Sequence, residues 1–183
     1  AVFAGNVEIS QRIVDVIFGA LGVVAASQGT MNNFIFGNNK FGFYETICGG
    51  SGAGPGFNGA SAVHTHMTNT RLTDLEIMEK NYPVLMKRFS IRRGSGGKGE
   101  FSGGDGVIRE FEFLDTLQVS LLTQRRKKSP FGLSGGNPGL PGKNLLKKNN
   151  IIYELEPLEQ LKVEKGDIIE IQTPGGGGYG TTI

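Results

Sequence analysis

One stretch of this sequence, residues 44–71, gathers most of the side chains that can do chemistry. It opens with the aromatic–acid pair Tyr44-Glu45 and continues into the glycine-rich run GGSGAGPG at 49–56. Glycines permit close approach of one backbone to another group and also permit positive φ. Successive N–H groups in such a loop can form a nest for an anion or a carbonyl oxygen. We therefore expect residues 44–71 to contain a binding site.

The two histidines of the chain, His64 and His66, are separated by a single residue within this stretch. On an extended strand both imidazoles point to one face, where they can hold a divalent metal or share acid–base work. On a helix they would lie about 200° apart and would not converge. Because residues 60–67 contain no helix-start signal, we expect the segment to be extended. Three interpretations stay open: a metal pair, a non-metal active-site pair, or structural histidines, since no third ligand lies at short spacing.

Carboxamide, hydroxyl and guanidinium groups before and after the glycine run can orient a polar ligand. We predict that His64 and His66 are catalytic and that the substrate-binding residues are Asn32, Asn33, Tyr44, Glu45, Gly49, Gly50, Ser51, Gly52, Asn69 and Arg71. No metal ligand is predicted.

Two helices are expected to position these residues. Apolar residues recur at steps of three and four from Val7 onward, which predicts a core helix capped by Asn6 and ended by Gly29. Its apolar stripe consists of Ile9, Ile13, Val16, Ile17, Ala20, Leu21 and Val24. The pattern Thr73-x-x-Glu76 predicts a capping box that starts a short helix, which ends before residue 83.

The sequence changes character at residue 83, which suggests a helix and site region at 1–82 and a β-rich region at 83–183. Strands are expected at 34–36, 41–47, 84–92, 107–114, 117–123, 151–155 and 167–172. Glycine-rich turns separate several of them, and the four glycines at 175–178 predict close approach to another backbone or subunit. The expected fold class is therefore α+β, with a barrel-like or sandwich-like β half.

Composition restricts the class of protein. The 183 residues are 38% hydrophobic and 20% charged, which is typical of a soluble globular chain. A net charge of +2 does not indicate a nucleic-acid or membrane surface. The basic run at 125–128 is interpreted as a solvated loop or an anion contact, and the arginines at the edges of expected strands, such as Arg109, as surface ion pairs. The single Cys48 is expected to be a buried thiol in a reducing, cytoplasmic compartment.

A series of ordered motifs resembles one known family. They are AGNVEISQRIVD, ASQGTMNN, YETICGGSGAGPGFNGASAVHTHMTNTRLTD, YPV, RRGSGGKGEFSGGDGVIRE, QRRKKSPFGLSGGNPG and TPGGGGYG, spread over residues 1–180. Together they are similar to the C-terminal part of the hydantoinase B/5-oxoprolinase family. Because the chain starts at Ala1 without Met and a helix is expected within a few residues, we also expect a piece of a longer polypeptide.

The resemblance implies a fragment of an ATP-dependent amidohydrolase that opens a cyclic amide such as 5-oxoproline or a hydantoin. It implies that ATP and Mg bind to a companion A-type subunit or domain. A divalent metal would be held by the N-terminal part of the B-type chain, and the complete enzyme would be an oligomer. Two alternatives stay open: a subunit of an ATP-dependent ketone carboxylase, and a scaffold region that assembles the larger enzyme without a catalytic group. In each case we expect the isolated chain to have no turnover.

Overall fold

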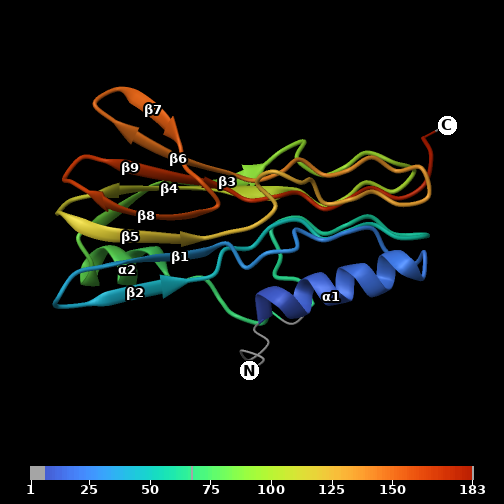
Figure 1. The fold of residues 1–183 in the computed structure, drawn as a ribbon, viewed down its shortest axis with the longest axis horizontal. Helices are drawn as coiled ribbons and strands as arrows, with labels where there is room; N and C mark the ends of the chain where they lie inside the picture. Colours follow the sequence, from blue (N-terminus) through green and yellow to red (C-terminus); the bar gives the residue numbers. More distant parts are fainter. Residues whose placement is uncertain (1–6, 67, 183) are drawn as a thin grey trace.

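The computed structural model describes residues 7–66 and 68–182 and consists of two β-sheets and two helices in that part of the chain (Figure 1). The elements are α1 (Val7–Ala20), β1 (Asn33–Gly37), β2 (Gly42–Glu45), α2 (Leu75–Asn81), β3 (Val84–Arg92), β4 (Gly106–Phe113), β5 (Leu117–Leu122), β6 (Lys143–Lys148), β7 (Ile151–Glu154), β8 (Leu158–Val163) and β9 (Ile168–Gln172). Neither helix is long and apolar enough to cross a bilayer.

The two antiparallel sheets form a sandwich rather than a closed barrel. One has the strand order β2-β1-β5-β8 and the other the order β3-β4-β9-β6-β7. Alternate residues of facing strands bury their aromatic rings between the sheets, because side chains alternate across a strand. Phe34 of β1 lies 4.6 Å from Phe111 of β4 between ring centroids, and both are fully buried. The α+β prediction is confirmed in its sandwich-like form.

The strand order places strands from both predicted regions, 1–82 and 83–183, in the same sheet. β1 and β2, which precede residue 83, share a sheet with β5 and β8, which follow it. The expected range 84–92 coincides with β3, and the other expected strands match within a few residues. Two strands, β6 and β8, were not predicted. Their sequences KNLLKK and LEQLKV carry charges at spacings that do not alternate cleanly with apolar residues.

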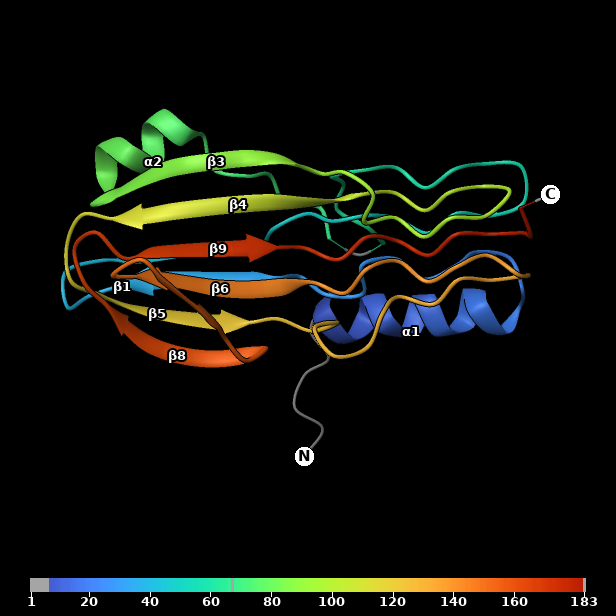
Figure 2. The same ribbon diagram turned by 90° about the horizontal axis from the view of Figure 1, so that it is seen from above.

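Beyond one end of the sandwich, long irregular segments run side by side along the molecule (Figure 2). We call the segments 49–60, 95–106 and 173–180 the glycine bundle. Backbone groups bond directly across it: the Gly176 N–H donates to the Gly104 carbonyl at 2.8 Å, and the Gly104 N–H donates to the Ser51 carbonyl at 2.9 Å. A Cβ added to Gly176 would lie 1.9 Å from the Ser51 oxygen, so only glycine fits there. The predicted close backbone approach of 175–178 is confirmed.

α1 packs along this half of the molecule (Figures 1 and 2). Its polar side faces inward. Its buried residues are Gln11 and Asp15, whereas Ile13, Val16 and Leu21 are 52%, 64% and 69% exposed. The prediction of a core helix was therefore wrong. Periodicity located the helix, but α1 ends at Ala20 and not at the predicted Gly29. The segments it packs against carry hydroxyl groups that pair with Gln11 and Asp15 instead of an apolar surface. The predicted Asn6 cap lies outside the described residues.

α2 begins one residue later than the capping-box pattern predicts. Asp74 rather than Thr73 is the N-cap, and its Oδ1 accepts hydrogen bonds from the N–H groups of Glu76 and Ile77 at 3.0 and 3.2 Å. The Thr73 N–H is used elsewhere, because it donates to Glu45 at 2.9 Å. The helix ends at Asn81, before residue 83, as expected.

Candidate functional site

The histidine segment is not the extended strand that its sequence predicted. Ala62 and His66 have φ values of 55° and 51°, in the left-handed region, and Val63 makes only an isolated bridge with Gly49. The alternation that would place both imidazoles on one face is therefore absent. His64 and His66 have separate environments, and each must be described by itself.

His66 forms a partly buried pair with a carboxylate from α1. Its Nε2 lies 2.8 Å from Asp15 Oδ1, and its side chain is 15% exposed while that of Asp15 is 1% exposed. The Ser27 N–H and hydroxyl also donate to the Asp15 carboxylate, at 3.0 and 3.1 Å. The Phe18 ring meets the imidazole edge-on at 5.9 Å. A carboxylate that fixes one ring nitrogen orients the other, which is the arrangement of a positioned general base.

Hydroxyl and amide groups extend this pair into a polar network beneath α1. The Gln11 amide donates to Thr68 Oγ1 and accepts from Thr65 Oγ1, the latter at 3.0 Å. Because Thr65 and Thr68 flank His66, the network fixes the histidine loop to the helix. Sequence analysis did not predict this network, because Gln11 lies more than fifty positions before Thr65 and Thr68.

His64 lies inside the chain without a hydrogen-bond partner. Both of its ring nitrogens are buried, and neither has a partner among the described residues. Burial lowers the pKa of His64 because the charged imidazolium loses its hydration. Its imidazole is therefore neutral at pH 7, and it does not face His66 across a shared site.

Glu45, a predicted binding residue, forms an ion pair that links the two sheets. Its Oε2 lies 2.8 Å from Arg109 Nη1, and both side chains are almost completely buried. The guanidinium lies 5.1 Å from the ring centres of both Phe89 and Phe111. Burial raises the pKa of Glu45, and the adjacent Arg109 charge and the Thr73 N–H oppose that shift. The interpretation of Arg109 as a surface ion pair was wrong.

The predicted carboxamides lie in two different places. Asn32 is fully buried: its Nδ2 donates to Gln28 Oε1 at 2.8 Å, and its Oδ1 accepts from Arg126 Nη1 at 2.7 Å. Asn33 instead accepts from the Tyr44 hydroxyl at 2.9 Å on the outer face of the β1–β2 pair. The remaining polar candidates, Asn69 and Arg71, are exposed. The structure therefore does not bring the predicted substrate-binding residues into one cavity.

Backbone donors of the glycine run are used within the chain. The N–H groups of Gly49, Gly50 and Ser51 donate to the carbonyls of residues 63, 174 and 60, at 3.2, 3.0 and 3.0 Å respectively. Gly52 packs so closely that a Cβ would lie 1.8 Å from the carbonyl oxygen of Ala25. These residues build the glycine bundle, so they do not form the predicted anion nest. Cys48, beside them, is buried as expected, and burial raises its pKa to about 11.

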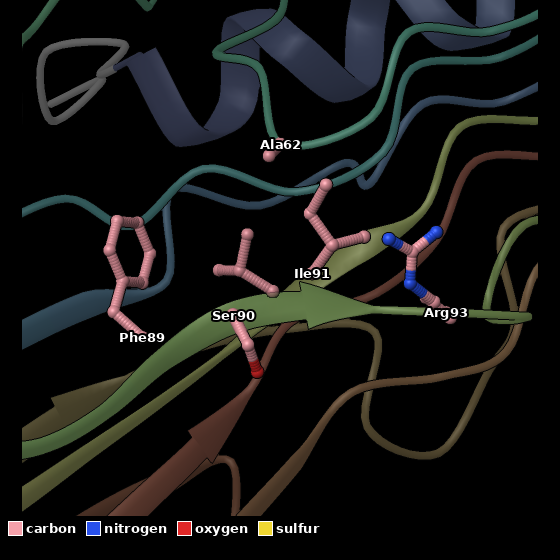
Figure 3. A pocket seen from close by; sticks show the side chains of 6 residues that line it. Ala62, Phe89, Ser90, Ile91 and Arg93 are labelled. Carbon is pink, nitrogen blue, oxygen red and sulfur yellow. The ribbon is translucent and has the colours of Figure 1, made fainter.

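A pocket of about 450 Å³ lies where the histidine loop crosses the edge strand β3 (Figure 3). Phe89, Ile91 and Arg93 point from β3 toward Ala62, while Ser90 points to the other side of the strand (Figure 3). Phe89 and Ile91 are each more than 40% exposed. The pocket thus combines an apolar wall with one cation. Sequence reasoning missed it, although the alternation of Phe89, Ile91 and Arg93 was a usable signal.

No cluster of three or more His, Cys, Asp or Glu side chains with the geometry of a metal site occurs within 7–66 and 68–182. Two features of this range could take part in binding or proton transfer: the His66–Asp15 pair and the β3 pocket. The loop 62–66 contributes to both, because Ala62 lines the pocket and His66 pairs with Asp15, but neither histidine lines the pocket.

Comparison with known proteins identifies the family. The family described as Hydantoinase B/oxoprolinase matches residues 1–182, and the chain belongs to that family. The chain is 55% identical over 181 residues to a 5-oxoprolinase of Dictyostelium discoideum, covering 98% of this chain and 14% of that protein. It is 54% identical over 185 residues to 5-oxoprolinase 1 of Arabidopsis thaliana, covering 100% of this chain and 14% of that protein. The chain therefore spans about one seventh of these relatives.

Solved structures share the fold. An ATP-dependent caprolactamase from Pseudomonas jessenii superposes with a TM-score of 0.73 at 26% identity, over 87% of this chain and 30% of that chain. A nucleotide-free acetone carboxylase gives a TM-score of 0.71 at 18% identity, over 86% of this chain and 26% of that one. The second likeness concerns the fold alone, whereas the first adds sequence similarity to a protein whose name refers to a lactam.

Proposed function

We propose that this chain is one part of an ATP-dependent hydrolase that opens a cyclic amide, with 5-oxoproline as the substrate class. The observation that carries the proposal is the 55% identity to a 5-oxoprolinase over 98% of this chain. The 26% identity to an ATP-dependent caprolactamase, a protein whose name refers to a lactam, supports the same reaction class. A ketone carboxylase is the second candidate, supported by the fold shared with acetone carboxylase.

The chemistry requires activation, because resonance makes a lactam carbonyl a poor electrophile. Phosphorylation of the amide oxygen by ATP, bound with Mg on a companion A-type subunit or domain, would turn that oxygen into a good leaving group. The site then has to orient the ring, bind its charged substituent and move a proton near pH 7. Each of these three tasks can be assigned to side chains of the β3 pocket and the histidine loop.

In this proposal the β3 pocket binds the lactam. The apolar faces of Phe89 and Ile91 suit a five-membered ring, and the Arg93 guanidinium suits the carboxylate that 5-oxoproline carries. His66, held by Asp15, transfers the proton through its other ring nitrogen. His64 has no orienting partner and is buried, which fits the structural interpretation of that residue.

The outward apolar face of α1 supports the proposal that this chain works inside a larger polypeptide. Ile13, Val16 and Leu21 lie on a face that no described residue covers, and exposed apolar patches of this kind mark interaction sites. Relatives are several times longer than this chain. We assign the N-terminal part of a B-type chain as the partner of α1. The same assembly would reside in a reducing cytoplasm, where the buried Cys48 thiol is stable.

The test uses the complete protein that contains this chain, together with its A-type part. Purified enzyme is supplied with ATP and 5-oxoproline, caprolactam, or acetone with bicarbonate, and release of ADP and of ring-opened product is measured. We expect ADP release coupled to opening of 5-oxoproline. Carboxylation of acetone with no lactam opening would overturn the proposal in favour of the ketone carboxylase.

Two variants separate a catalytic role from a scaffold role. Arg93→Gln should raise KM for 5-oxoproline about tenfold or more with little change in kcat, because it removes a ground-state charge contact. His66→Gln should lower kcat at unchanged KM. Arg88→Gln, on the same strand and exposed, serves as the matched control. Unchanged kinetics in both test variants would favour the scaffold interpretation.

A further inference from the structure

A second pocket, of about 410 Å³, lies between α1 and the loop that follows β5. Five cationic side chains line it: Arg12 from α1 and Arg125, Arg126, Lys127 and Lys128 from the loop. No acidic side chain lines it. The basic run that sequence analysis interpreted as a solvated loop or an anion contact therefore faces a cavity, and a fifth cation joins it from a helix more than one hundred positions away.

Among the described residues, no carboxylate forms an ion pair with the three arginines or with Lys128 of this pocket. Arg126 donates to three neutral acceptors: Asn32 Oδ1 at 2.7 Å, the Gln124 carbonyl at 2.8 Å and Asn144 Oδ1 at 2.8 Å. Arg125 Nη1 donates to the Ser129 carbonyl at 3.1 Å, and its buried Nε has no partner among the described residues. The one ion pair at the pocket joins Lys127 to Glu156 at 2.9 Å, and both side chains are mostly exposed.

Two nearby carboxylates, Asp15 and Glu8, attract Arg125 and Arg126 respectively without forming ion pairs with them. Asp15 is bound to Ser27 and His66, and Glu8 accepts from the Met31 N–H at 2.6 Å. Burial lowers the pKa of Arg125; the Asp15 carboxylate opposes that shift, and the charge of Arg12 adds to it. Like charges gathered in a partly buried cavity are unfavourable unless an anion enters. The pocket is therefore incomplete without a ligand of opposite charge.

We propose that this pocket binds the phosphate group of a phosphorylated small molecule. Several guanidinium and ammonium groups in one cavity match a ligand with more than one negative charge, and the planar fork of Arg suits phosphate oxygens. A monocarboxylate would leave most of the positive charge unbalanced. The volume exceeds that of a phosphate group alone, so the ligand carries a further moiety. This pocket shares no lining residue with the β3 pocket, to which the proposed function assigns the lactam.

Binding to the 183-residue chain is measured by calorimetry with pyrophosphate, acetyl phosphate, ATP, adenosine and an oligoglutamate peptide. We expect saturable binding of pyrophosphate that weakens as NaCl is added. Arg12→Gln and Lys128→Gln should each weaken it about tenfold. Lys165→Gln, which removes one exposed charge at the β8–β9 turn, is the control and should leave binding unchanged. Circular dichroism establishes that each variant is folded.

Three results would overturn the assignment. The first is the absence of saturable pyrophosphate binding up to about 10 mM. The second is a loss of pyrophosphate affinity in Lys165→Gln equal to that in the pocket variants. The third is tighter binding of oligoglutamate than of pyrophosphate, which would indicate an acidic protein partner. Competition by adenosine would identify a nucleotide as the source of the phosphate. Binding of acetyl phosphate without adenosine competition would identify a phosphorylated substrate. Because no turnover is measured, this test is independent of the lactam proposal.

Discussion

His64 is a residue whose burial links protonation to folding. Its folded pKa lies below the unfolded value, so below about pH 6.5 the unfolded chain binds more protons and stability falls as pH decreases. Above the unfolded pKa the imidazole is neutral in both states and this contribution is fully present. His64→Gln should remove part of the stability loss on acidification, because glutamine does not titrate.

Urea unfolding at about pH 7.5 and about pH 5.5 measures that loss. We expect a smaller difference between the two conditions in His64→Gln than in the unaltered chain. His66→Gln is the comparison, since it removes an imidazole that pairs with Asp15 rather than one that is unpaired. An identical pH dependence in the unaltered chain and in His64→Gln would contradict the prediction.

Residue types alone located the histidine loop but not the partners of its side chains. The two histidines were identifiable because they are the only ones in the sequence. Their environments depend on a helix some fifty positions earlier, which supplies Asp15 to His66 and nothing to His64. Similarly, nothing near Glu45 in the sequence indicates Arg109, which the packing of one sheet on the other places next to it. Long-range pairing of this kind has no local signature.

At the scale of elements, the start of α2 gives a direct test of cap assignment. Asp74→Ala should lower the free energy of unfolding by about 1 kcal/mol, because two N–H groups lose their acceptor. Thr73→Ala should cost less, since the bond from Thr73 to Glu45 uses the backbone N–H and survives the change. Chemical denaturation of both variants measures the two losses in the free energy of unfolding. A larger loss in Thr73→Ala than in Asp74→Ala would support the capping-box assignment instead.

Elements with a clear periodicity were predictable from the sequence, and the others were not. β5 and α1 follow strand and helix periods closely, and both were located. β6 and β8 are polar strands whose partners, not their own side chains, determine their conformation. The predicted orientation of α1 was wrong for another reason. An apolar stripe on a helix indicates that another surface covers it, but that surface need not belong to the same 183 residues.

At the scale of the whole molecule, the glycine bundle should tolerate no side chains at its contacts. Gly176→Ala would place a Cβ 1.9 Å from the Ser51 carbonyl oxygen, and the backbone of residues 51–52 cannot shift away easily. We expect a loss of about 3 kcal/mol or more. Gly42→Ala is the matched control, because a Cβ there meets nothing within 4 Å. Thermal unfolding of the two variants compares them, and similar midpoints would contradict the proposed packing.

The glycine bundle also has a consequence for the calorimetric behaviour of the protein. Its segments meet through peptide groups rather than aliphatic side chains, so melting that half hydrates mainly polar surface. Exposure of polar surface lowers the heat capacity, whereas apolar surface raises it. The heat-capacity increment per residue should therefore lie below the usual range of about 12–15 cal/mol/K. A small increment flattens the curve of stability against temperature, so this part of the molecule would resist cold better than its modest core suggests.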